Sequence, residues 1–183
     1  MTVRDIVLYA HDPAPLRKKC KAVKGVNRHT RRLIQDLRDT LNAHVDGIGL
    51  AAPQINVHRR VVVVRLGGGY DDECEPDPPI ALLNPKIIEA KNERKDFDGC
   101  LSFPGLYATT IRPNNLRVIG LDEHGKSFDR IFTGFDVVIV HHEIDHLDGV
   151  LLIDRVERIG DFFEVHKDKT GRLIRAPLSV ALE

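Results

Sequence analysis

The 183-residue sequence lacks several features that are typical of secreted, membrane-bound and nucleic-acid-binding proteins. It has 27 Lys and Arg against 27 Asp and Glu, so its formal charge is zero and indicates neither a DNA partner nor an anionic membrane. The longest apolar runs, such as residues 61–64, are far shorter than the roughly 20 residues needed to span a bilayer. Three cysteines are an odd number in a chain too long to need disulfides. The start of the chain contains Asp5 and no long apolar segment, so it does not resemble a secretory signal, and we expect a cytoplasmic protein.

The composition is that of one folded domain. Apolar residues make up 42% of the chain and charged residues 30%, which is enough apolar material for a hydrophobic core. At about 150 residues per domain, we expect residues 1–183 to form a single domain. We also expect a monomer.

Periodicity predicts two helices among several strands. A helix over residues 27–45 carries apolar residues at helical spacing, and Gly47 follows as a stop signal. Strands are predicted at 60–66, 80–89 and 150–153, with a hairpin formed by 116–122 and 127–132. Residues 71–79 are acidic and rich in proline, which indicates an exposed loop, and the segment after residue 161 gives no clear signal.

The second helix is predicted to begin near Gly134, with Thr133 as its cap. The elements do not alternate as βαβ units, so we expect an α+β fold. In this fold, small mixed or antiparallel sheets would surround a central helix that carries a His-Glu-x-x-His motif.

That motif is His142-Glu143-Ile144-Asp145-His146. Residues four apart lie on one face of a helix, so the imidazoles of His142 and His146 can reach one metal ion. Glu143, beside them, can take a proton from a water molecule that the metal activates and can return it to a leaving group. The pattern indicates a metal hydrolase, although five residues of this kind also arise by chance in an ordinary amphipathic helix.

The residues alone leave the third metal ligand open. Metzincin proteases carry a third His where this chain has Leu152, and they need a Met-turn that a chain with Met1 as its only methionine cannot form. A thermolysin-like endopeptidase would use a downstream Glu, for which Glu164 is the best candidate. Cys100 is the other option, because a thiolate binds zinc or ferrous iron well.

Another segment rich in small residues is GIGLAAPQ, residues 47–54. Such residues allow the backbone to approach a ligand closely, but they also form ordinary tight corners between elements. The segment lacks the glycine spacing and the Lys-Ser or Lys-Thr of a phosphate-binding loop.

Taken together, three segments resemble the peptide deformylase family. They are GIGLAAPQ (47–54), DGCLSFP (98–104) and HEIDHLDG (142–149), in the order in which the family carries its signatures. The similarity extends over about residues 7–156.

The resemblance implies a divalent metal held by Cys100, His142 and His146. This metal is most often Fe²⁺ in the family, and Zn²⁺, Ni²⁺ or Co²⁺ can take its place. Glu143 would be the general acid and base, while Gln54 and the backbone N–H of Leu101 would stabilise the developing oxyanion.

The substrate implied by the resemblance is an N-formylmethionyl peptide, from which the enzyme releases formate. Gly49 would lie beside the formyl group, and Ile48 and Ile139 would form walls of the methionine pocket.

Some residues depart from the family pattern. Asp98 stands where the family usually has Glu, and His141 where it usually has Gln; we expect His141 to point away from the metal. Pro177 would disrupt the basic C-terminal helix with which many bacterial members end. The resemblance implies the ribosome as a partner, whereas the different C-terminus argues for the alternative, a deformylase that acts on a non-ribosomal peptide or a small formamide. A zinc endopeptidase and a non-catalytic metal-binding protein remain further hypotheses.

Overall fold

The computed structural model describes residues 2–67, 78–167 and 173–178. Within these residues, seven strands form one antiparallel sheet in the order β1-β2-β3-β4-β6-β7, and β5 pairs with β4 beside this path. The strands are β1 (Gly49–Ala51), β2 (Val61–Val64), β3 (Ile80–Gly99), β4 (Tyr107–Leu121), β5 (Ser127–Thr133), β6 (Phe162–Lys167) and β7 (Leu173–Pro177).

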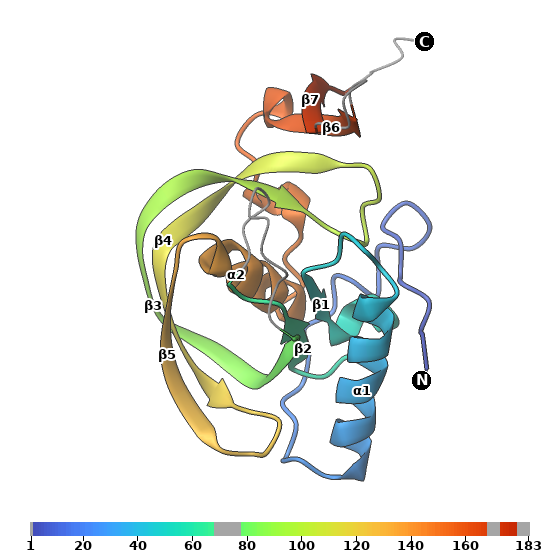
Figure 1. The fold of residues 1–183 in the computed structure, drawn as a ribbon, viewed down its shortest axis with the longest axis vertical. Coiled ribbons are helices and arrows are strands. Elements are labelled where there is room, and N and C mark those ends of the chain that lie inside the picture. Colours follow the sequence, from blue (N-terminus) through green and yellow to red (C-terminus); the bar gives the residue numbers. More distant parts are fainter. Residues whose placement is uncertain (1, 68–77, 168–172, 179–183) are drawn as a thin grey trace.

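The sheet differs from the small, separate sheets that the sequence predicts. The strand predicted to end at residue 89 continues to Gly99, paired with β4. A shift of register accommodates Asn84 and Pro85, so these two residues do not interrupt the strand. The long strands β3 and β4 curl around the second helix, α2, with β5 on the same side (Figure 1).

Helix α1 (Arg28–Asn42) begins close to where the sequence predicts it. The side chain of Asn27 accepts a hydrogen bond from the backbone N–H of Thr30 at 3.0 Å and so caps the first turn. The helix ends before the predicted Val45, which is 99% exposed and belongs to the following loop.

Strand β2 is buried on both faces, which explains its unbroken run of valines. Val61 and Val63 belong to the same apolar cluster as Ile34, Leu37 and Leu41 of α1. Val62 and Val64 point to the opposite face, where they share a cluster with the apolar residues of α2. The sheet therefore separates two parts of the core, and each part contains one helix.

Helix α2 (Phe135–Leu147) lies within the curve of the sheet (Figure 1). Residues 137–147 are all buried, so its apolar residues are not confined to one stripe. The predicted cap was wrong, because Thr133 is the last residue of β5 and the cap position is held by Gly134 at φ 60°. This positive φ suits glycine and makes the sharp turn from strand to helix possible.

The chain after α2 also differs from the prediction. In place of a strand at 150–153, a short 3₁₀ helix spans Leu152–Arg155, in which the Asp154 carboxylate accepts a hydrogen bond from the Leu151 N–H at 2.8 Å. Strands β6 and β7 then form a hairpin, with Pro177 at the end of β7, where no central ladder is broken. Most of the predicted acidic loop lies outside the described residues. No helix among the described residues is long and apolar enough to cross a membrane.

Candidate active site

The structure brings Cys100, His142 and His146 together from two elements. Cys100 directly follows β3, and the two histidines lie one turn apart on α2. One sulfur or nitrogen atom from each residue lies within 4.8 Å of the others, and Cys100 Sγ is 3.3 Å from His146 Nε2. Both histidines are buried, so the three side chains form a compact cluster with little access to water.

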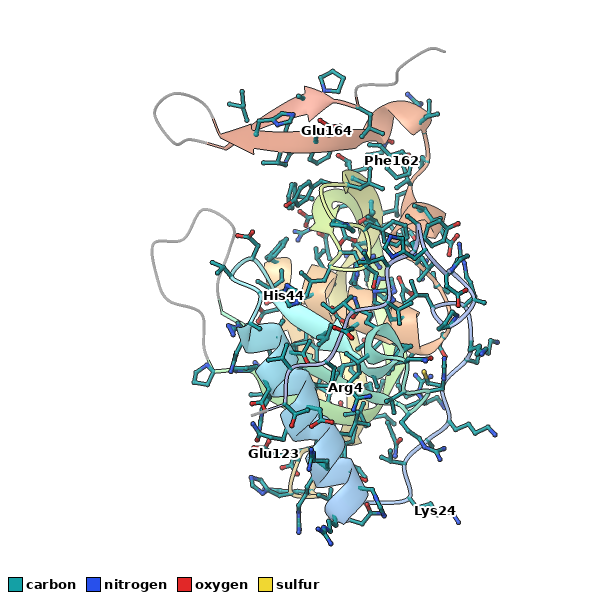
Figure 2. All side chains as sticks on the ribbon, turned by 90° about the vertical axis from the view of Figure 1, so that its right-hand side faces the viewer. Arg4, Lys24, His44, Glu123, Phe162 and Glu164 are labelled. Carbon is teal, nitrogen blue, oxygen red and sulfur yellow. The ribbon has the colours of Figure 1, made fainter. Side chains whose placement is uncertain are left out.

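Glu164 is not part of this cluster. It lies on β6, in the hairpin at one end of the molecule's long axis (Figure 2). Its carboxylate is 3.0 Å from His166 Nε2 on the same strand. The sequence left two candidates for the third ligand, Cys100 and Glu164. Within the part of the chain that it describes, the structure places only Cys100 beside the histidine pair.

The donor atoms fit a divalent transition metal. Asp98 accepts a hydrogen bond from His142 Nδ1 at 2.8 Å, which leaves Nε2 of this ring to face the cluster. A thiolate with two imidazoles suits iron, zinc, cobalt and nickel, and three protein ligands leave a position open. The cluster thus has the composition of a catalytic metal site.

A fully buried arginine pairs with carboxylates that lie next to these ligands. Arg112 on β4 forms ion pairs with Asp98 at 2.7 Å and with Asp145 at 2.5 Å. Its guanidinium also lies 3.0 Å from His141 Nδ1, so His141 contacts the arginine and does not join the metal cluster. Burial opposes the charge on Asp98, but His142 and Arg112 hold the pKa of this carboxyl well below its usual range.

Sequence reasoning missed Arg112. An isolated arginine in a strand has no local signature, and its partners lie 14 and 33 residues away along the chain. The only hint in the sequence was the two carboxylates inside the motifs, Asp98 and Asp145, since such groups need a cation once the fold buries them.

Glu143 is buried next to the metal cluster. Among the described residues its Oε2 atom has no hydrogen-bond partner. Burial raises the pKa of Glu143 to about 7, despite the opposing effect of His142. A carboxyl with such a pKa can take up and release a proton near neutral pH.

Gly49 is the residue that admits Glu143 to this position. A Cβ atom at residue 49 would lie 2.9 Å from Glu143 Cδ and 3.0 Å from Cγ, closer than real Cβ contacts allow. The small residues of segment 47–54 therefore allow the backbone to approach Glu143 closely, in addition to forming a tight corner between elements.

Gln54 is buried, with both ends of its amide oriented. Its Oε1 accepts a hydrogen bond from Ala51 N–H at 2.8 Å, so Nε2 is directed to Ser102 Oγ at 3.2 Å and to Cys100 Sγ at 3.6 Å. This arrangement places an amide donor beside the metal cluster.

A cavity of about 380 Å³ opens onto these groups. The expected residues Ile48, Gly49, Leu101 and Ile139 all line it, together with Gln54 and Glu143. The cavity is also lined by residues that the sequence did not single out, among them His44, Asp46, Tyr107, Phe135 and Val138. The apolar side chains make it suitable for an apolar group beside the polar cluster.

Comparisons with known proteins agree with this geometry. The polypeptide deformylase family model matches residues 3–161. A peptide deformylase of Thermomicrobium roseum is 40% identical over 157 residues, covering 86% of this chain and 88% of the relative. One of Heliobacterium modesticaldum is 42% identical over 151 residues, covering 82% and 93%. The crystal structure of peptide deformylase from Ehrlichia chaffeensis in complex with actinonin superimposes with a TM-score of 0.76 at 31% identity, covering 86% of this chain and 91% of the other.

Proposed function

Because the chain belongs to the polypeptide deformylase family, we propose that Cys100, His142 and His146 hold its metal ion and that Glu143 transfers the protons of the reaction. The enzyme is a hydrolase that removes the formyl group from N-formylmethionyl peptides and releases formate. The observation that supports the site assignment best is the compact Cys-His-His cluster with a buried carboxyl beside it.

The proposed ion is Fe²⁺, which Zn²⁺, Ni²⁺ or Co²⁺ can replace. The mixed thiolate and imidazole donors suit all four, so availability and redox conditions decide which one is bound. An ion held there would act as a Lewis acid that polarises the formyl carbonyl and activates water.

Glu143 holds and transfers the proton in this proposal. Its carboxylate takes a proton from the attacking water and later delivers it to the amine that leaves. The buried position supports this role, because a pKa of about 7 allows both steps near neutral pH.

The remaining groups orient the formamide. Gln54 Nε2 and the backbone N–H of Leu101 donate hydrogen bonds to the oxygen on which negative charge develops. Gly49 leaves room for the small formyl group, while Ile48 and Ile139 contact the methionine side chain; all three line the cavity.

We further propose a single-domain, monomeric, cytoplasmic enzyme whose substrates are newly made chains at the ribosome. We also propose that the helix carrying the His-Glu-x-x-His motif is the central element of this fold, with the curled sheet around it. The position of Glu164, on the hairpin away from the cluster, gives no support to the endopeptidase hypothesis.

The test is formate release from formyl-Met-Ala-Ser by protein purified anaerobically with Fe²⁺ or Ni²⁺. We expect rapid release by the wild type and a loss of about 10²-fold or more in Glu143→Gln that still binds metal. Cys100→Ser should lose both metal and activity, whereas Glu164→Gln, the matched control, should keep both. Metal bound in the wild type without any formate release would contradict the assigned activity.

A further inference from the structure

Of the acidic residues that line the cavity, one is exposed. Asp46 and the half-buried His44 lie in the loop between α1 and β1, and both line the cavity. His44 lies at the end of α1 that is nearer the C-terminal hairpin (Figure 2). Asp46 is exposed, so this loop forms part of the cavity mouth.

The other charged groups of the cavity are compensated or deeply buried. Asp98 is paired with Arg112 and His142, and Glu143 lies beside the metal cluster. Asp46, in contrast, has no cationic partner within the described ranges. A carboxylate of this kind attracts a cation that binds at the mouth and repels an anion.

Tyr107 forms another part of the mouth. It is the first residue of β4, and it lines the same cavity as Asp46. Burial raises the pKa of the Tyr107 phenol, and the charge of Asp46 raises it further, so the hydroxyl stays neutral. The neutral hydroxyl adds a hydrogen-bonding group without reducing the negative charge.

The mouth lies within reach of a short peptide. Asp46 is only three residues before Gly49, which contacts Glu143, so their Cα atoms are at most about 11 Å apart. Tyr107 is paired with Gly99, the neighbour of Cys100. An extended peptide advances about 3.3 Å per residue, so its second and third residues reach the mouth when its formyl group is at Glu143.

We propose that Asp46 makes the enzyme select formylmethionyl peptides that carry a cationic side chain at the second or third residue over those that carry an acidic one. This inference rests on the proposed function, because it assumes that the formyl group lies beside Glu143. Its basis is an exposed carboxylate that has no cationic partner within the described ranges and lines the same cavity as the reacting groups.

The test compares kcat/KM for three C-terminally amidated peptides, formyl-Met-Ala-Lys, formyl-Met-Ala-Ser and formyl-Met-Ala-Glu, at pH 8 and low salt. Because one exposed charge pair contributes on the order of 1 kcal/mol, we expect the Lys peptide to exceed the Glu peptide by about three- to tenfold. Asp46→Asn should reduce this ratio to near one, and Asp46→Lys should invert it. Added salt at about 0.5 M should shrink the wild-type ratio, because it screens exposed charges.

Asp129→Asn is the matched control, since it removes an exposed carboxylate on β5 that does not line the cavity. It should leave the ratio at its wild-type value. Equal rates on the three peptides, or a ratio that survives in Asp46→Asn, would overturn the inference and leave the deformylase assignment intact. Failure to cleave any of the three would instead refute the proposed function and the selectivity with it.

Discussion

Replacing Gly49 by alanine tests whether the position of Glu143 controls the reaction. The added methyl group would lie 2.9 Å from Glu143 Cδ, and ordinary contacts begin near 3.4 Å. The carboxyl carbon must therefore move by about 0.5 Å, and the oxygen that is nearer to residue 49 must move further. Because misplacing a reacting group by about 1 Å costs on the order of 10²-fold, we expect kcat/KM to fall by about 10- to 100-fold.

The assay is formate release by Gly49→Ala, with metal content measured on the same sample. The three atoms nearest to the new methyl group all belong to Glu143, so we expect the metal to be retained and the loss to appear mainly in kcat. Gly160→Ala is the matched control, because a Cβ at residue 160 meets nothing within 4 Å, and its activity should equal that of the wild type.

A double-mutant cycle separates displacement of Glu143 from simple blocking of the substrate. Glu143→Asp shortens the side chain, so in the Gly49→Ala background it should cost less than it does alone. A Gly49→Ala variant with full metal and wild-type kcat/KM would refute the reasoning. So would additive losses accompanied by a higher KM, which would mean that the methyl group only obstructs the substrate.

Other predictions concern stability and the C-terminal hairpin. Arg112→Leu removes the cation that the buried Asp98 and Asp145 share, leaving them only His142 and Arg155 as partners, and urea unfolding should show a loss of about 3–5 kcal/mol. Burial raises the pKa of the Cys20 thiol to about 11, so between pH 9 and 11 the unfolded chain loses a proton that the native state keeps. The free energy of unfolding should therefore fall as the pH rises through this window, and Cys20→Ala should remove that slope in urea titrations. Phe163→Ala removes a ring whose centroid is 6.3 Å from that of Tyr107, and we expect it to raise KM more than it lowers kcat.

Local patterns in the sequence predict elements whose environment is simple. The spacing of apolar residues locates α1, because one face of this helix packs on the sheet and the other meets water. The hairpin of β4 and β5 follows in the same way from its turn at residues 122–126. In both cases the residues needed for the prediction are close together in the sequence.

Local propensity failed where distant contacts decide the conformation. Propensity alone favours a strand at residues 137–140, and the helix there was predicted correctly only because the His-Glu-x-x-His motif follows; the curled sheet surrounds this helix with apolar side chains. Residues 150–153 read as a strand, but the chain forms a 3₁₀ turn at Leu152–Arg155, since the Asp154 side chain accepts a hydrogen bond from the Leu151 N–H and also pairs with Arg17. Neither influence is visible in a local window of sequence.

The candidate site shows the same contrast between residues that local motifs predict and residues that only the fold brings together. Motif spacing was enough to single out His142 and Glu143, whereas Cys100 was one of two open candidates until the family resemblance favoured it. It could not identify Arg112, whose importance depends entirely on two carboxylates brought to it by the fold. Nor could it identify Asp46, since an exposed acidic residue is ordinary until a cavity is known to open beside it.

The structure also separates the groups proposed for chemistry from those proposed for selectivity. The proposed ligand His142 is tied through Asp98 to the buried ion pairs of Arg112, so a change there disturbs the site. Tyr107 at the mouth instead packs against Phe97 and Phe163, and Arg175 of the hairpin lies over both of these rings. The family match ends at residue 161, so this hairpin is a part of the chain that can differ from the matched relatives and still contact the cavity mouth. A divergent C-terminus should therefore alter which peptides are preferred before it alters the hydrolysis itself.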